Sequence, residues 1–152
     1  MKKGILYITT LIACIALFSG CNKSNTLTIN PSMTASLGTY TFNAGTITPS
    51  LLKPQLNDTV TSLIITGYDP TIKQTIVLTV RNYKEQTGTF SIIMGQASGT
   101  FNAYGVTNTA NSGIIAITNI TTNTITGYYS FTTTSGIVLT NGAFVVGRPW
   151  SY

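Results

Sequence analysis

Three acidic side chains limit the acid–base chemistry of this 152-residue chain. They are Asp58, Asp69 and Glu85, and the sequence contains no histidine. Two carboxylates about 5–9.5 Å apart can hydrolyse a glycosidic bond, so a hydrolase that uses Asp69 or Glu85 is one hypothesis. Asp58 and Asp69, however, stand in loop-type stretches, where aspartate caps a turn by accepting hydrogen bonds from nearby backbone. The sequence therefore favours structural roles for these carboxylates, and we predict that the chain is not an enzyme.

Nucleophilic and metal-dependent chemistry also lack suitable side chains. Serine and cysteine nucleophiles depend on a neighbouring base, usually histidine, and nitrogen- or sulfur-ligated metal sites need clusters of histidine or cysteine. The chain has two cysteines, Cys14 and Cys21. A calcium site needs a loop rich in acidic oxygen ligands, and no such loop is present in the sequence. We therefore predict no catalytic residue, no metal and no cofactor.

Cys21 stands at the end of a segment that predicts lipid attachment. The chain opens with MKK, and residues 5–18 are apolar except for two threonines. This run is shorter than the ~20 apolar residues of a membrane-spanning helix and has the length of a signal-peptide core. It ends in LFSGC, which resembles a bacterial lipobox because small residues directly precede the cysteine, although Phe18 stands where leucine is usual. An uncleaved anchor or an ordinary signal peptide is the alternative.

The interpretation divides the chain into four parts. Residues 1–20 are a lipoprotein signal peptide, and residues 21–32 are a polar tether lipidated at Cys21. Two or more acyl chains hold a protein stably on a membrane, so the predicted membrane contact needs no spanning segment. Residues 33–146 form the folded domain, and residues 147–152 are a C-terminal tail.

Charges are few and scattered along the chain. Charged residues make up 7% of the sequence, and the formal net charge is +5. Loss of the signal peptide removes two lysines and leaves six basic residues against three acidic ones. A nucleic-acid-binding protein presents a clustered basic face, whereas here only Arg81 and Lys84 are close together in the sequence. We therefore expect no nucleic-acid partner.

The domain shows strand patterns and no helical stripe. Threonine, valine, isoleucine and aromatic residues recur with a period of two, which is typical of half-buried strands, and glycine, asparagine and proline interrupt the runs. We predict an all-β fold, either an antiparallel β-sandwich or a meandering β-barrel, of about eight or nine strands. The predicted strands cover residues 34–37, 39–44, 60–66, 75–82, 88–94, 99–106, 113–119, 124–132 and 136–146.

A short pattern recurs within these strands. A glycine is followed two residues later by an aromatic residue and, usually, two residues after that by an apolar one, starting at Gly38, Gly88, Gly99, Gly127 and Gly142. The glycine permits a turn or bulge at a strand entry, and the aromatic residue and the residue two later share one face. The predicted core contains Tyr40, Phe42, Phe90, Ile92, Phe101, Tyr129, Phe131, Phe144 and Val146, with Ile76, Leu78, Val80, Ile115, Ile117, Ile137 and Leu139.

Four segments carry a resemblance to a known family. Residues 33–44 (MTASLGTYTFNA) resemble an opening Met-x-Ala-x-x-x-Gly-x-x-aromatic-x-Ala motif, with the glycine one position earlier, at Gly38, and with Phe42 where Trp is usual. Residues 113–118 (GIIAIT), 125–131 (ITGYYSF) and 140–144 (TNGAF) match later strand motifs. With them the chain resembles a family of uncharacterised lipoproteins from Bacteroidota, classed as a domain of unknown function. The resemblance implies an envelope location and an all-β fold, and it implies no activity.

The resemblance also bears on location and modification. Some lipoproteins of Bacteroidota reach the cell surface through an acidic stretch after the cysteine, and residues 22–25 (NKSN) contain no acid. We therefore expect lipid anchoring in the bacterial cell envelope, at the outer membrane, with the periplasmic face favoured over the cell surface. Residues 58–60 (DTV) fit the three-residue pattern for O-glycosylation in these bacteria, which makes Thr59 a candidate for a glycan.

Aromatic side chains are the remaining candidates for binding. Exposed tyrosine and tryptophan rings stack on sugars and line ligand clefts, because one ring offers apolar area and a polar group. Alternatively, the tyrosines only rim the sheet edges. The leading hypothesis is a non-enzymatic β-domain that binds a glycan or small amphiphile, and the alternative is an accessory subunit that docks on an envelope protein. The candidate ligand-binding aromatics are Tyr68, Tyr83, Tyr104, Tyr128 and Trp150.

Overall fold

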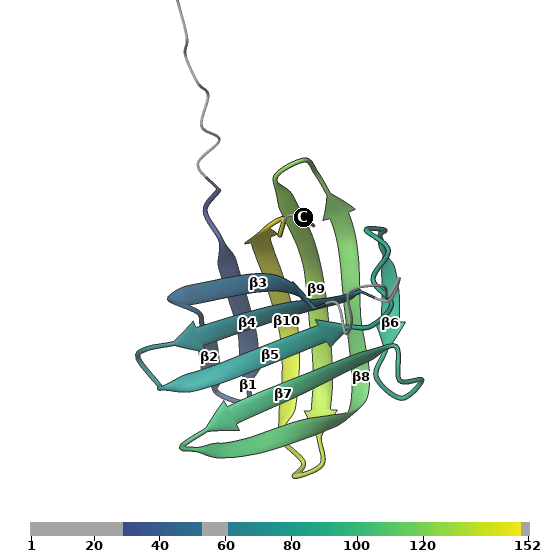
Figure 1. Ribbon diagram of the computed structural model, residues 1–152. Helices are drawn as coiled ribbons and strands as arrows, with labels where there is room; N and C mark the ends of the chain where they lie inside the picture. The colour runs from purple at the N-terminus through teal and green to yellow at the C-terminus, as the bar shows by residue number, and fades with distance from the viewer. Residues whose placement is uncertain (1–28, 53–60, 150–152) are drawn as a thin grey trace, which may run out of the picture.

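Alternation of buried and exposed side chains builds ten strands in this protein. The structure is a computed structural model that describes residues 29–52 and 61–149. In these ranges the chain forms ten strands and no helix (Figure 1). The all-β prediction is confirmed, with one strand more than the eight or nine expected. The strands are β1 (Ser32–Leu37), β2 (Tyr40–Asn43), β3 (Thr46–Leu52), β4 (Ser62–Asp69), β5 (Gln74–Val80), β6 (Gly88–Ser91), β7 (Ala97–Ala103), β8 (Val106–Ile120), β9 (Thr124–Thr133) and β10 (Val138–Gly147).

The strands form one antiparallel sheet that curls into a half-barrel. This shape is intermediate between the predicted β-sandwich and the predicted β-barrel. Their order is β2-β1-β10-β9-β8-β7-β5-β4-β3, and β6 pairs with β8. Figure 1 shows β3, β4, β5 and β7 crossing in front of β1, β10 and β9. Two residues, Ala44 and Gly45, connect β2 and β3, the two end strands of the sheet. Ala44 N–H donates to Met33 O in β1, and Gly45 N–H donates to Tyr68 O in β4, each at 2.9 Å.

Strand β8 belongs to both layers because it bends at Gly113. Residues 106–109 pair with β7, and residues 110–120 pair with β9. Gly113 has a φ of +128°, and a Cβ at this position would lie 2.2 Å from the carbonyl oxygen of Ser130. Only glycine fits such a conformation and such a close approach. One strand therefore carries the chain from the front layer to the rear layer.

The interior between the layers is apolar and aromatic. Tyr129 is fully buried, its ring centroid lies 6.2 Å from that of Phe131 and 6.5 Å from that of Phe144, and its hydroxyl donates to Thr34 O at 3.1 Å. Burial raises the pKa of the Tyr129 hydroxyl far above its ordinary value. Most of the predicted core is confirmed: Phe42, Ile76, Leu78, Val80, Ile92, Phe101, Ile115, Ile117, Tyr129, Phe131, Leu139, Phe144 and Val146 are buried, and Phe90 and Ile137 pack half-buried against them.

Several predictions about the strands are wrong. The predicted strand over residues 99–106 runs through Tyr104 and Gly105, which form the turn between β7 and β8. The sequence pattern predicts no strand over β3, where Pro49 interrupts the run, but β3 is an edge strand, and an edge tolerates a proline that cannot donate a hydrogen bond. Tyr40 is predicted inside and is 72% exposed. It opens β2 directly beside the β1–β2 turn, where the strand extends past the buried cluster.

The recurring glycines match their predicted role at strand entries only in part, and Gly88 does open β6. Gly38 does lie in a turn, with a φ of +60°. Gly127 instead lies inside β9, where a Cβ would be 2.1 Å from Ala116 O and 2.4 Å from the Phe144 ring. The missing side chain at Gly127 makes room for an aromatic ring from the neighbouring strand.

Candidate functional site

Three turns that are distant in the sequence meet at one end of the half-barrel and enclose a groove. They are the turns between β1 and β2, between β4 and β5, and between β7 and β8, whose strand ends lie along one margin of the sheet in Figure 1. The groove has a volume of about 500 Å³. Its lining residues are Leu37, Tyr40, Thr71, Ile72, Lys73, Gln74, Phe101 and Tyr104.

The β7–β8 turn presents Tyr104 to solvent in a costly conformation. Ala103 pairs with Val106, which leaves Tyr104 and Gly105 as a two-residue turn with φ values of +54° and +81°. Positive φ at both positions is the type I′ pattern, which favours Asn-Gly or Gly-Gly. A left-handed conformation costs roughly 1–2 kcal/mol for a residue with a Cβ, and Tyr104 is 87% exposed. Since packing within the domain does not offset this cost, the ring is a candidate contact for a ligand.

Asp69 fixes the β4–β5 turn and joins it to β2. Its buried carboxylate accepts hydrogen bonds from the backbone N–H groups of Thr71 (2.8 Å) and Ile72 (3.4 Å), and from Asn43 N–H at 2.8 Å. Burial alone would raise the pKa of Asp69, but the hydrogen bonds from Asn43, Thr71 and Ile72 outweigh it and hold this pKa below its ordinary value. The predicted turn cap is confirmed, and the carboxylate also ties together two walls of the groove.

The groove combines an apolar floor with a polar rim. Phe101 is buried at its base, and Leu37 and Ile72 are half-buried against the core cluster. Thr71 and Lys73 are exposed at the rim. Of the described residues that line the groove, Lys73 alone carries a charge. Such a mixture of apolar surface and a few polar groups is typical of small-ligand sites.

The predicted binding aromatics do not converge on one site. Tyr104 lines the groove, whereas Tyr68 is exposed on the outer face of β4 and Tyr128 on the outer face of β9. Tyr40, which lines the groove, is absent from the predicted set because the strand pattern assigns it to the core. Its position directly after the predicted Gly38 turn is the signal that could have placed it at the rim.

Tyr83 is predicted to be accessible for binding, and the structure contradicts this. The side chain is only 4% exposed and belongs to the buried core cluster, and its backbone N–H donates to Thr61 O at 2.7 Å. Burial and the nearby Glu85 carboxylate raise the pKa of Tyr83, while Arg148 opposes this shift. The remaining candidates, Cys21, Thr59 and Trp150, lie outside the described residues.

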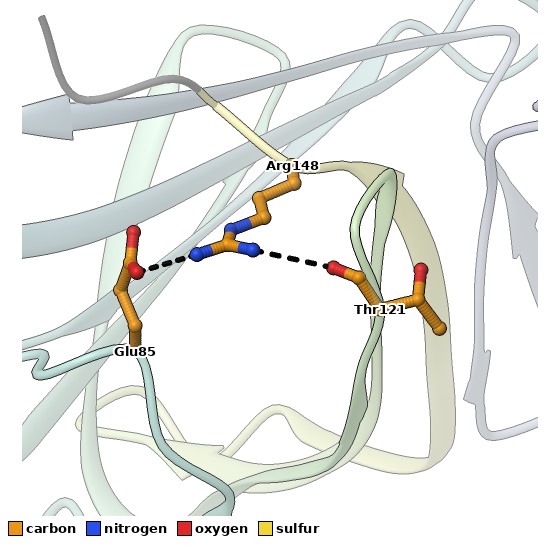
Figure 2. Close-up of polar contacts among 3 residues, drawn as sticks. All are labelled: Glu85, Thr121 and Arg148. Atoms are coloured by element: carbon orange, nitrogen blue, oxygen red, sulfur yellow. Dashed lines mark hydrogen bonds and ion pairs between the residues drawn. The ribbon is translucent and has the colours of Figure 1, made fainter.

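The acidic side chain of Glu85 serves a structural contact. Its carboxylate forms an ion pair with the Arg148 guanidinium at 2.5 Å, and Arg148 also donates to Thr121 O at 3.5 Å (Figure 2). These contacts join the loop before β6, the end of β10 and the β8–β9 turn. Asp69 and Glu85 are thus both engaged in holding turns in place, and Asp58 lies outside the described residues.

A second cavity of about 490 Å³ lies beside the β8–β9 turn. The Thr121 hydroxyl oxygen there accepts hydrogen bonds from Asn123 N–H (3.2 Å) and Thr124 N–H (2.9 Å), and it lies 2.8 Å from the Thr124 hydroxyl. Neither an aromatic nor a charged side chain is among its described lining residues. They are Ile29, Asn30, Thr121, Thr122, Asn123, Thr124 and Val145.

Comparisons with known proteins give no indication of the function of this chain. No family model, no curated protein and no solved structure matches the chain. In residues 29–52 and 61–149, no group of three or more acidic, histidine or cysteine side chains could hold a metal ion. The same residues include no helix long and apolar enough to cross a membrane.

Proposed function

We propose that this protein is a lipid-anchored domain of the bacterial cell envelope that binds a ligand in the groove without catalysing a reaction. The ligand class is a glycan or a small amphiphile. The observation that carries the proposal is the exposure of two tyrosines, 72% for Tyr40 and 87% for Tyr104, at the edge of one apolar-floored groove.

The exposed rings gain free energy when a ligand covers them. Burial of apolar surface is worth roughly 25 cal/mol per Å², and a tyrosine ring also offers a hydroxyl for hydrogen bonding. Tyrosine loses little conformational entropy on binding because it has only two side-chain torsions. Thr71 and Gln74 lie in the same lining and supply donors and acceptors for polar groups of the ligand. A sugar ring or an alkyl glycoside presents this combination of an apolar face and hydroxyl groups.

Replacement of Tyr104 by asparagine tests the proposal without weakening the turn. Asparagine suits the first position of a type I′ turn, so Tyr104→Asn should fold at least as well as the natural chain. Calorimetric titration of the full chain with maltotriose and with hexyl glucoside measures binding of a glycan and of a neutral amphiphile. We expect Tyr104→Asn to weaken the observed binding about tenfold, the loss of a stacking contact of ~1–1.5 kcal/mol.

Tyr128→Thr is the matched control, because it removes an exposed tyrosine on the outer face of β9, away from the groove. The control should bind as tightly as the natural chain. Equal affinity of all three proteins for a probe that binds would contradict the proposal.

The anchor and the location are tested separately from the groove. Metabolic labelling with a fatty acid should label the natural chain and fail with Cys21→Ser. Protease treatment of intact cells should leave the domain protected, and opening of the outer membrane should expose it. Cleavage in intact cells would overturn the periplasmic assignment. A mature mass equal to polypeptide plus lipid would remove the proposed glycan on Thr59.

An accessory role in an envelope assembly is the second candidate function, and the β6–β7 turn favours it. Ile93 and Met94 are 75% and 74% exposed there. Hydrogen bonds from Gly95 N–H to Ile92 O (2.9 Å) and from Gln96 N–H to Ser91 O (3.0 Å) hold the turn in shape. Exposed apolar side chains on a fixed turn suit a protein partner. Photo-crosslinking from position 94 in cells should capture one constant partner under this alternative, and a protein that stays monomeric and uncrosslinked would exclude it.

A further inference from the structure

Lys73 gives the groove a positive charge that the turn itself does not require. It is the last residue of the β4–β5 turn, exposed at the rim directly after Ile72, which packs against the core. Its φ of +52° lies in the left-handed region, which glycine and asparagine occupy at lower cost than lysine. The backbone of this turn would therefore be at least as stable with glycine or asparagine at position 73.

In the described part of the chain, Lys73 has no acidic partner. The ion pair found there joins Arg148 to Glu85, and neither residue lines the groove. Asp69 is close in sequence, but its carboxylate is buried and both of its oxygens accept backbone hydrogen bonds. The negative charge of Asp69 is thus directed into the turn, and the ammonium group of Lys73 faces solvent at the groove rim.

The other lining groups restrict what kind of anion would fit. Tyr40 and Tyr104 provide ring faces, while the Thr71 hydroxyl and the Gln74 amide both donate and accept hydrogen bonds. A neutral glycan would leave the charge of Lys73 unused, and a fatty acid would leave the hydroxyl-binding groups unused. We propose that the groove takes a carboxylated saccharide of the uronate type, with a sugar face on a tyrosine ring and the carboxylate on Lys73. This inference rests on the proposed function, because it specifies the ligand of the same groove.

A pair of probes that differ in charge and in one methyl group per carboxyl tests the inference. The full chain is titrated calorimetrically with tri-galacturonate and with its fully methyl-esterified form, which keeps the sugar rings and removes the carboxylate charge. We expect the acid to bind about tenfold more tightly than the ester at low ionic strength, and the difference to shrink in 0.5 M salt, because salt screens exposed charges. Tyr104→Asn should weaken the binding of both the acid and the ester.

Lys73→Asn and Lys84→Asn are the matched variants. Asparagine at position 73 removes the charge and keeps a residue that tolerates the left-handed conformation. The preference for the acid should disappear in Lys73→Asn and persist in Lys84→Asn, because Lys84 is exposed but does not line the groove.

The possible outcomes distinguish failure of the uronate inference from failure of the proposed function. Equal binding of acid and ester by the natural chain would overturn the uronate inference and leave ligand binding in the groove intact. Binding of neither form, together with no binding of maltotriose or hexyl glucoside, would overturn the proposed function itself. A preference for the acid that survives in Lys73→Asn would overturn the assignment of the carboxylate to Lys73.

Discussion

Strand β8 begins at Val106, beside the Tyr104–Gly105 turn, and ends at Ile120, beside the Thr121–Thr124 turn. At the second turn, the Thr121 hydroxyl binds backbone and side-chain groups of its own turn, and the Arg148 guanidinium donates to the Thr121 carbonyl. At the first turn, Tyr104 adopts a costly backbone conformation and projects its ring into solvent. The polar groups of the Thr121–Thr124 turn are hydrogen-bonded within the protein and offer few contacts to a ligand. The ring of Tyr104 in the other turn is free to contact one.

The two cavities beside these turns have nearly equal volumes, so volume alone does not single out the proposed binding site. Their volumes are about 490 and 500 Å³. The groove has two exposed tyrosines, an apolar floor and one cation, and the cavity at the β8–β9 turn has neutral polar and aliphatic lining. The chemistry of the lining therefore favours the Tyr104 end as the place for the proposed ligand.

Gly113→Ala should have the largest effect, because it removes the bend that sends the two ends of β8 into different layers. The new Cβ would lie 2.2 Å from Ser130 O at a φ of +128°, so we expect a loss of about 3 kcal/mol or more in the free energy of unfolding, measured by urea denaturation. Gly136→Ala is the control, since φ is +84° but no atom lies within 4 Å, and it should cost only ~1 kcal/mol. Equal losses in the two variants would show that the bend is not decisive.

Asp69→Asn should have the next largest effect, and the effect should depend on pH. Loss of the charged acceptor for three backbone N–H groups should cost about 1–3 kcal/mol at neutral pH. The pKa of Asp69 is lowered in the folded protein, so the unfolded chain takes up the proton first as the pH falls. The stabilisation should be fully present above about pH 5 and disappear only as the pH falls below 4, through the lowered pKa.

Unfolding free energies of the natural chain and of Asp69→Asn, measured from pH 7 to pH 2.5, test this expectation. The difference should be flat at the upper end of the range and shrink at the acidic end. Glu85→Gln serves as the control, because its partly exposed ion pair with Arg148 should be worth less than ~1 kcal/mol. A difference that vanishes between pH 7 and pH 5 would refute the lowered pKa.

Thr121→Ala and Tyr104→Asn should have small and opposite effects on stability. Removal of the Thr121 hydroxyl deletes a capping acceptor and should cost ~0.5–1 kcal/mol, with no change in ligand affinity. Tyr104→Asn relieves a strained tyrosine and should gain ~0.5 kcal/mol, with loss of affinity. Thermal unfolding and calorimetric titration of both variants check these directions. Weaker binding by Thr121→Ala, or a destabilised fold in Tyr104→Asn, would contradict the different roles of the two turns.

The predictable part of the fold comes from strands with one buried face. In β5, Ile76, Leu78 and Val80 all face the core, and their period of two is visible in the sequence. β3 is not predictable in this way, because none of its residues is buried and Pro49 interrupts the pattern. Local alternation reports burial against a neighbour, and it is weak in β3 because the inward residues of this strand are only half-buried.

The groove is harder to predict because it exists only once the sheet has curled. The cap from Asp69 to Thr71 spans two residues and follows from local turn chemistry, but the bond to Asn43 spans 26 residues. Tyr40 opens β2 at one end of the sheet order, and Tyr104 lies in the β7–β8 turn near its middle. The curling of the sheet brings both residues to the groove. Sequence reasoning therefore finds Tyr104 as an exposed ring without the partners that make it part of a site.

Mapping of amide chemical shifts in the full, isotope-labelled chain during titration with tri-galacturonate tests the central claim most directly. The account predicts that the largest shifts fall on residues 71–74 and 103–105, with the amides of residues 121–124 unchanged. Largest shifts at residues 121–124, or no shift at either turn, would contradict it.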